Sequence, residues 1–180
     1  MSRSLALALV LAILAALAGG APAEAPLPIV PGVAIGPMVL GAPGSRTATA
    51  WGPARLRKAR QGAHYRWHEY PERSAWMLVR DGIVVRAGVE SSGYATREGF
   101  QVGTRVESIV TRWGRTKPRR AIPWTEHPGL REEDQFEPSV PPERYFLDYS
   151  SRGISFLVDA TLGQVVSIQI YPPRRPGSTR

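Results

Sequence analysis

Two stretches of the chain share one spacing of glycine and tryptophan, and this spacing restricts the fold more than any other feature. Gly41 is followed ten residues later by Trp51-Gly52, and Gly103 is followed ten residues later by Trp113-Gly114. The two stretches are offset by 62 residues at each matching position. Self-similarity at such a distance indicates repeated supersecondary units. The sequence therefore predicts two copies of one small unit.

Each spacing predicts a short helix that stops at its Trp-Gly pair. In the second stretch Thr104 is the expected cap, with Glu107 at the capping-box distance, and Gly114 is the expected stop. Ser45 is the expected cap of the first helix, which has no large aliphatic residue and should be weaker. The apolar stripe of the second helix is formed by Val106, Ile109, Val110 and Trp113.

Three strands are expected after each helix, because the residues there alternate or form short apolar runs. Asp81-Gly82 is a strong hairpin signal between two of them. The predicted fold class is α+β: two αβββ repeats, with an antiparallel sheet and short helices on one of its faces. The expected strands lie at 65–70, 75–79 and 83–89 in the first copy, and at 145–149, 154–158 and 165–171 in the second.

The predicted repeats fill most of the chain. The first is placed at residues 35–90. The second is placed at 99–171 and carries a Pro-rich insertion at 115–143. Residues 24–34 are expected to be a Pro-rich linker, and residues 172–180 a disordered basic tail.

The amino terminus predicts a signal peptide at residues 1–23. Arg3 supplies a positive start, Leu5 to Ala18 are fourteen uninterrupted apolar residues, and Ala21-Pro22-Ala23 is a cleavage pattern. Fourteen residues fall short of the roughly 17–25 that a membrane-spanning helix needs. We therefore expect export to the periplasm or the extracellular space, with no transmembrane segment in the mature chain.

Cysteine is absent from all 180 residues, which excludes disulfides, thiolate metal sites, cysteine nucleophiles and lipid attachment to cysteine. Lys and Arg outnumber Asp and Glu by 23 to 15, so the formal net charge is +8. A basic protein is drawn to anionic surfaces. Nucleic acid is not an expected partner, because the protein is expected to be exported.

The order of elements resembles the β-lactamase-inhibitory-protein-like fold, and also the small outer-membrane assembly lipoproteins that have a single such unit. The residues that match are Leu40-Gly41 with Trp51-Gly52, and Val102-Gly103 with Trp113-Gly114. The resemblance implies a binding scaffold rather than a reaction. No functional residue is carried over from either family, and the lipid-anchoring cysteine of the lipoproteins is absent.

Candidate binding residues form two basic clusters, one after each Trp-Gly pair, and an aromatic group on the first expected sheet. Exposed aromatic residues beside arginine are typical anchors for a protein partner. The alternative for the basic clusters is a solvated face whose charge prevents aggregation. Trp51, Trp76 and Trp113 are expected in the core. The candidate binding residues are Arg55, Arg57, Lys58, Arg60, Arg66, Trp67, Tyr70, Arg115, Lys117, Arg119 and Arg120.

The sequence has few residue patterns that are typical of a catalytic or metal-binding site. His64 and His68 are four residues apart, and on a strand that separation of about 13 Å is too long for one ion. Glu132-Glu133-Asp134 lies in a polar run that is expected to be solvated. No catalytic residue, metal or cofactor is therefore expected.

The leading hypothesis is an exported, non-enzymatic binding or accessory protein. Its partner would be a protein of the cell envelope or of the extracellular space, or an anionic polymer or lipid surface. Two alternatives stay open. One is an enzyme of unrecognised type that uses His64 or His68 with an acid from residues 132–134. The other is a structural subunit of an envelope complex.

Overall fold

The computed structural model describes residues 25–58, 62, 64–120 and 144–174. The signal peptide expected at 1–23, most of the expected insertion and the end of the expected tail lie outside the described residues. The elements in chain order are β1 (Leu27–Val30), β2 (Ala34–Ile35), β3 (Met38–Val39), α2 (Gly44–Trp51), β4 (Arg55–Lys58), β5 (Tyr65–Tyr70), the 3-10 turn η1 (Pro71–Arg73), β6 (Ala75–Arg80), β7 (Ile83–Val89), β8 (Tyr94–Thr96), α3 (Val106–Trp113), β9 (Pro118–Arg120), β10 (Arg144–Tyr149), β11 (Ile154–Asp159) and β12 (Gln164–Ile170).

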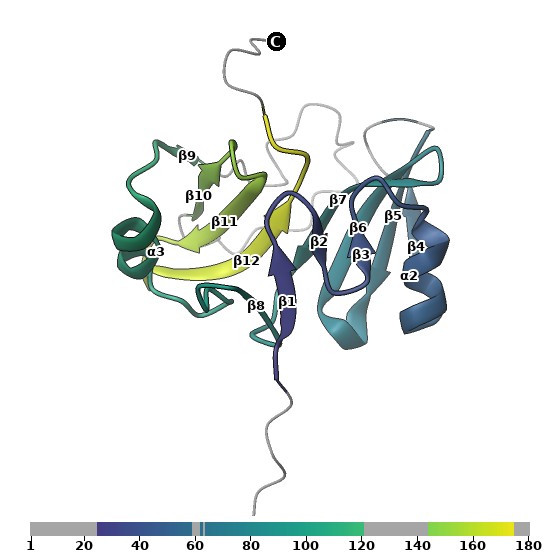
Figure 1. Cartoon of the computed structure of the whole chain (residues 1–180), viewed down its shortest axis with the longest axis horizontal. Helices are drawn as coiled ribbons and strands as arrows, with labels where there is room; N and C mark the ends of the chain where they lie inside the picture. Colours follow the sequence, from purple (N-terminus) through teal and green to yellow (C-terminus); the bar gives the residue numbers. More distant parts are fainter. Residues whose placement is uncertain (1–24, 59–61, 63, 121–143, 175–180) are drawn as a thin grey trace, which may run out of the picture.

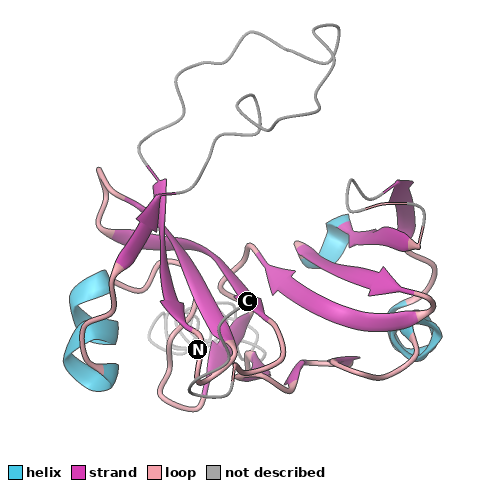
Figure 2. Ribbon diagram, turned by 90° about the horizontal axis from the view of Figure 1, so that it is seen from above, coloured by secondary structure: helices cyan, strands magenta, loops and turns pink. Residues whose placement is uncertain are grey.

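Two sheets form the framework of the molecule. The larger has eight strands in the order β4-β5-β6-β7-β12-β11-β10-β9, and every neighbouring pair is antiparallel. The smaller has four strands in the order β3-β2-β1-β8. Figures 1 and 2 show the small sheet, α2 and α3 on one side of the eight-stranded sheet.

The core lies between the two layers. Ile29, Ile35 and Met38 of the small sheet are at most 2% exposed, and they join one buried cluster with the inward residues of the large sheet, among them Phe156 and Ile168. The alternation of side chains along each strand supplies this arrangement, because every second residue points to the same face. With no cysteine in the chain, apolar burial and backbone hydrogen bonding hold the layers together.

Both helices end where expected and are tied to the large sheet by their last residue. The ring centroids of Trp51 and Tyr70 are 5.2 Å apart, and those of Trp113 and Tyr149 are also 5.2 Å apart, each pair in an edge-to-face arrangement. Neither helix has the expected cap. Pro43 and Arg105 are the N-cap residues, and the Thr104 hydroxyl instead accepts a hydrogen bond from the Gln101 N–H at 2.9 Å.

The predicted fold class was wrong, because the structure is mostly β. Each helix has only eight residues, whereas the two sheets have twelve strands in the described part of the chain. In the large sheet four strands, not three, follow each helix, because the basic segments after the Trp-Gly pairs form the edge strands β4 and β9. The first helix is also followed by β8, which belongs to the small sheet. The boundaries of the two predicted repeats stay a prediction.

The expected linker at 24–34 also differs from its prediction. Its prolines flank or lie in β1, and Ile29 of that strand is 2% exposed, so the segment belongs to the fold. The first residues of the expected tail are attached as well, since the Arg174 N–H donates a hydrogen bond to the Ser150 carbonyl at 2.9 Å. Among the described residues, no helix has the length and apolar character to cross a membrane.

Candidate functional site

The side of the eight-stranded sheet that faces away from α2, α3 and the small sheet is here called the outer face. No described helix packs against it (Figure 2). The strand registers place the residues that share this face, because directly paired residues point to the same side. They are Arg55, Arg57, Trp67, Glu69, Trp76, Leu78, Arg86, Gln169, Ser155, Asp148, Phe146 and Arg119.

A pair of stacked tryptophans is the main apolar feature of the outer face. The rings of Trp67 and Trp76 are 4.4 Å apart between centroids, with an angle of 18° between their planes. Both residues are half-buried. Gly88 makes room for this stack, because a Cβ atom there would come within 2.4 Å of Trp76 Cζ2. The result is an aromatic platform of two stacked indoles that is half-buried on the outer face.

Ion pairs flank the outer face at both edges of the sheet. Arg57 Nε of β4 lies 3.1 Å from Glu69 Oε2 of β5, and Arg119 Nε of β9 lies 2.8 Å from Asp148 Oδ2 of β10. In each pair the arginine side chain is more than half exposed and the carboxylate is about a quarter exposed or less. Pairs at such exposure contribute up to about 1 kcal/mol to folding, so they mainly fix the orientation of their side chains.

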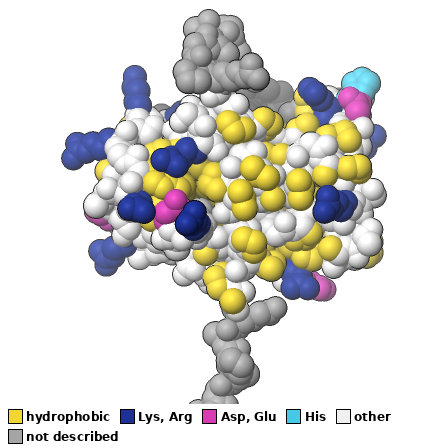
Figure 3. Space-filling model, viewed as in Figure 1, with side chains coloured by type: hydrophobic (Ala, Val, Ile, Leu, Met, Phe, Trp, Pro, Cys, Tyr) yellow, Lys and Arg dark blue, Asp and Glu magenta, His cyan; other side chains and the backbone are white. Residues whose placement is uncertain are grey.

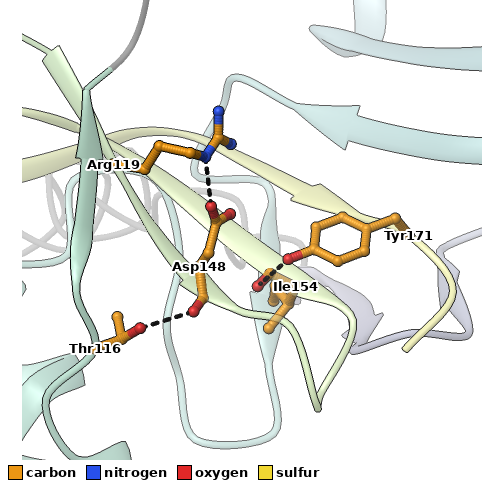
Figure 4. A network of polar contacts seen from close by, with 5 residues as sticks. All are labelled: Thr116, Arg119, Asp148, Ile154 and Tyr171. Carbon is orange, nitrogen blue, oxygen red and sulfur yellow. Dashed lines mark hydrogen bonds and ion pairs between the residues drawn. The ribbon is translucent and has the colours of Figure 1, made fainter. Parts of the chain in front are cut away.

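A polar network surrounds the second of these pairs (Figure 4). The Thr116 hydroxyl donates to the Asp148 carbonyl at 2.9 Å, and the Tyr171 hydroxyl donates to the Ile154 carbonyl at 3.3 Å. Burial raises the pKa of the Asp148 carboxyl. The hydrogen bond and charge of Arg119, together with the Ser155 hydroxyl and the Arg174 charge, outweigh this effect and bring the pKa below its usual value.

Tyr171 and Arg86 belong to the same network. Burial, followed by the Asp148 charge, raises the pKa of the Tyr171 phenol to about 12. The Arg86 guanidinium carbon lies 5.8 Å from the centre of the Tyr171 ring. Burial is also the largest effect on the Arg86 guanidinium and lowers its pKa. By surface area Tyr171 is half-buried and Arg86 is exposed, so the network lies at the boundary between the sheet and solvent.

The structure brings only some of the predicted binding residues together. Arg55, Arg57, Trp67 and Arg119 share the outer face, whereas Lys58 and Arg66 are exposed on the opposite side of their strands. Arg115 and Lys117 are exposed in the segment between α3 and β9. Arg60 and the side chain of Arg120 lie outside what the structure describes.

Two aromatic predictions were wrong. Tyr70 was expected as a binding anchor, but it is 4% exposed and packs against Trp51 in the core. Trp76 was expected in the core, but it lies on the outer face against Trp67. The cause is the register, because Tyr70 and Trp76 sit on opposite faces of neighbouring strands. Trp51 and Trp113 do pack against the core, as expected.

The two basic clusters have an ordinary structural role as well. β4 and β9 are the edges of the eight-stranded sheet, and all four residues of β4 are exposed. Positive charge on an edge strand prevents pairing with a second chain. This role accounts for Arg55 and Lys58 without any ligand. Arg57 and Arg119 differ from these residues, because each is paired with a carboxylate that fixes its orientation over the outer face.

In the alternative enzyme hypothesis, His64 or His68 would act with an acid from residues 132–134, but the acid beside His64 in the structure is Asp81. His64 Nδ1 lies 3.0 Å from Asp81 Oδ1, with both side chains well exposed. These two residues, His68 and Ser45 line an open depression of about 660 Å³. Among the described residues no hydrogen bond joins Ser45 to His64, and no group of three His, Asp or Glu residues could hold a metal. Residues 132–134, the expected source of an acid, lie outside the described residues.

The opposite side of the molecule exposes apolar side chains over the small sheet (Figure 3). Val30 and Val33 are 45% and 52% exposed there. Scattered exposed valines are common on protein surfaces. Among the described residues, this side has no stacked aromatic pair.

Sequence reasoning missed the central residues of the outer face. Arg86, Asp148, Ser155 and Tyr171 are far apart in the sequence and stand in unremarkable strand patterns. They meet only because β7, β12, β11 and β10 are neighbours in the sheet. A prediction of strand order would have been needed to find them.

No protein-family model matches the sequence, and no curated protein matches it. Solved structures do resemble the fold. An extracellular protein containing a SCP domain from Bacillus anthracis is 12% identical, with a TM-score of 0.51, and the match covers 74% of this chain and 44% of that one. The chain thus spans less than half the length of that protein, and the likeness concerns the fold alone.

Two further structures match at lower scores. The uncharacterized protein YfeY from Escherichia coli has a TM-score of 0.45 and 17% identity, over 81% of this chain and 99% of that one. A cysteine-rich secretory protein from Staphylococcus aureus has a TM-score of 0.48 and 11% identity, over 84% of this chain and 48% of that one. The predicted resemblance to β-lactamase-inhibitory proteins and assembly lipoproteins stays a prediction.

Proposed function

We propose that this chain is an exported, non-enzymatic binding protein that docks a protein partner on its outer face. One observation carries the proposal: the stacked pair Trp67 and Trp76 is half-buried on a sheet face that no described helix covers. Tryptophan and arginine are enriched among residues that dominate protein–protein binding energy. The signal peptide expected at 1–23 supports export.

The surroundings of the tryptophan pair support a protein partner over a plain anionic surface. Arg57 and Glu69 lie side by side at its edge and carry opposite charges. A rim of mixed charge around an apolar centre is the usual anatomy of a protein interface. A uniformly anionic lipid or polymer would gain little from an apolar platform, and it would be repelled by the carboxylate of Glu69.

The experiment compares three forms of the tagged protein, expressed in the native host. Wild type, Trp67→Ala and the control Val33→Ser are purified under mild conditions, and the co-purifying proteins are identified. We expect at least one protein to be retained by wild type and Val33→Ser but lost from Trp67→Ala. With that partner purified, Trp67→Ala should weaken binding by about 30-fold or more, the range of a dominant interface residue.

Val33→Ser is a matched control because it removes an exposed apolar side chain from the opposite side of the molecule. Thermal unfolding of each variant confirms that the fold is kept. Capture that survives Trp67→Ala, or that is lost in Val33→Ser, contradicts the proposal. Equal binding of wild type and Trp67→Ala to anionic vesicles, with no protein captured, would instead favour a lipid surface.

A further inference from the structure

The edge strand β4 has one side of its backbone open. It is the first strand in the order of the large sheet, and among the described strands it pairs with β5 alone. All four of its residues are exposed, and no described turn or loop forms a backbone hydrogen bond with it. The free side of an edge strand presents N–H and C=O groups to which another strand can pair.

The opposite edge of the sheet is protected in a way that β4 is not. That edge is β9, and it begins with Pro118, which has no N–H to donate. Proline on an edge strand hinders the addition of a further strand. No proline lies within the four residues of β4. The two edges therefore differ in backbone chemistry, and β4 is the one that can accept a strand.

The side chains of β4 alternate in a way that specifies what such a strand would carry. Arg55 and Arg57 point to the outer face, whereas Leu56 points to the other side and is 63% exposed. Directly opposite residues on paired strands have their Cβ atoms about 4.5–5.5 Å apart. An acidic residue beside each arginine and an apolar residue beside Leu56 would complement this strand.

The positive charge of β4 selects among possible strands. Arg57 is paired with Glu69, but Arg55 and Lys58 have no ion pair with another described residue. A second copy of this chain would bring the same cations and a net charge of +8, so the charge opposes pairing between copies. It attracts an acidic strand for the same reason.

The open edge lies beside the tryptophan platform. Arg57 of β4 is directly paired with Trp67 of β5. Neighbouring strands are about 4.8 Å apart, so a strand added to β4 would run roughly 10 Å from the strand that carries Trp67. One partner can therefore contact the platform and the edge together.

We infer that an extended acidic segment of the partner pairs with β4 and adds a strand to the large sheet. Its residues alternate between acidic ones, beside Arg55 and Arg57, and apolar ones, beside Leu56. In this mode of recognition the backbone hydrogen bonds supply affinity and the alternate side chains supply specificity. The inference rests on the proposed function and deepens it, because it states how the protein partner is held.

The experiment uses a synthetic peptide, so it does not depend on finding the partner. Acetyl-TEVEVET-amide, in which glutamate alternates with valine or threonine, is titrated into the ¹⁵N-labelled protein at constant ionic strength. We expect saturable shifts of the β4 amide signals and slower hydrogen exchange at alternate β4 residues. Acetyl-TVVTEEE-amide has the same composition and charge without the alternation, and it should bind severalfold more weakly.

Two N-methylated forms of the alternating peptide separate backbone pairing from attraction between charges. One form is methylated at its three glutamates, and the other at its valines and threonines. Successive N–H groups of a strand point to opposite edges, so only one of these sets faces β4. We expect one methylated peptide to lose binding and the other to keep it.

Two charge reversals provide a matched pair of variants. Arg55→Glu turns an opposite-charge cross-strand pair into a like-charge pair and should weaken binding of the alternating peptide severalfold. Arg97→Glu makes the same change in net charge at an exposed position after β8, so it should weaken binding much less. Thermal unfolding of both variants confirms that the fold is kept.

The inference is overturned if the alternating peptide gives no saturable shift at β4, or if both methylated peptides, or neither, lose binding. It is also overturned if the two charge reversals weaken binding equally, since the effect would then be one of net charge. Failure here is distinct from failure of the proposed function. Partner capture that depends on Trp67 can persist without strand addition, and peptide pairing at β4 can persist with no captured protein.

Discussion

Gly88→Ala tests whether the tryptophan platform has the geometry described here. Gly88 is buried in β7, and a Cβ atom at this position would lie 2.4 Å from Cζ2 and 2.5 Å from Cε2 of Trp76. These are atoms of a rigid ring system, so the indole must move as a whole. Its movement would break the parallel stack on Trp67.

The expected size of the effect follows from three contributions. Forcing an extra carbon into a packed site costs about 1–3 kcal/mol, and losing an aromatic pair costs about 0.5–1.5 kcal/mol. Replacing glycine by alanine in a strand returns about 0.5–1 kcal/mol. We expect the free energy of unfolding to fall by about 1–3 kcal/mol, measured by urea denaturation with an unchanged m-value. The near-ultraviolet circular dichroism of the coupled indoles should weaken in parallel.

A double-mutant cycle decides whether the clash is the cause. In a Trp76→Ala background the added carbon meets no ring, so Gly88→Ala should be neutral or slightly stabilising there. Gly93→Ala is the control, because the nearest atom to its Cβ would be the Ser91 hydroxyl at 3.6 Å. An equal loss of stability from Gly88→Ala in both backgrounds would refute the reasoning.

The remaining predictions concern stability against pH, each measured by urea unfolding across a pH series. Tyr171 has a folded-state pKa of about 12 against 10.0 unperturbed, so stability should fall as pH rises from about 10 through 12, and Tyr171→Phe should reduce that fall. Asp148 has a lowered pKa, so its contribution is present above the unfolded value of 3.8 and is lost as pH falls through the folded value; Asp148→Asn should flatten this acid limb. Burial lowers the pKa of His68, so its contribution to the free energy of unfolding should be complete above pH 6.5 and should decrease as the pH falls below that value. His68→Gln should remove this decrease. A variant that leaves its pH limb unchanged shows that the named group does not titrate as described.

Much of the local structure could be predicted because its signals lie in neighbouring residues. The Trp-Gly pairs end both helices, and Asp81-Gly82 forms the turn between β6 and β7. The edge strands β4 and β9 could not be found this way. Their residues are mostly charged, and only pairing with β5 and β10 makes them strands. The strands of the small sheet were missed for a similar reason, since two of them have only two residues each.

The candidate site was predicted less well than the elements that carry it. Arg57, Trp67 and Arg119 were identified as binding residues and share the outer face. Tyr70, three residues after Trp67 on β5, points into the core instead. A period of two residues separates the faces of a strand, but the pattern alone does not say which face is buried.

The sequence by itself determined where helices stop, where hairpins turn, that no disulfide supports the fold and that the chain is strongly basic. These properties depend on residue type and on neighbours within a few positions. Only the tertiary structure decided which face of the large sheet is covered, which basic residues lie at its edges, and that Arg119 is paired with Asp148. The reason is physical: a strand's partners and its buried face are set by contacts between residues distant in the chain, and those contacts leave no local pattern.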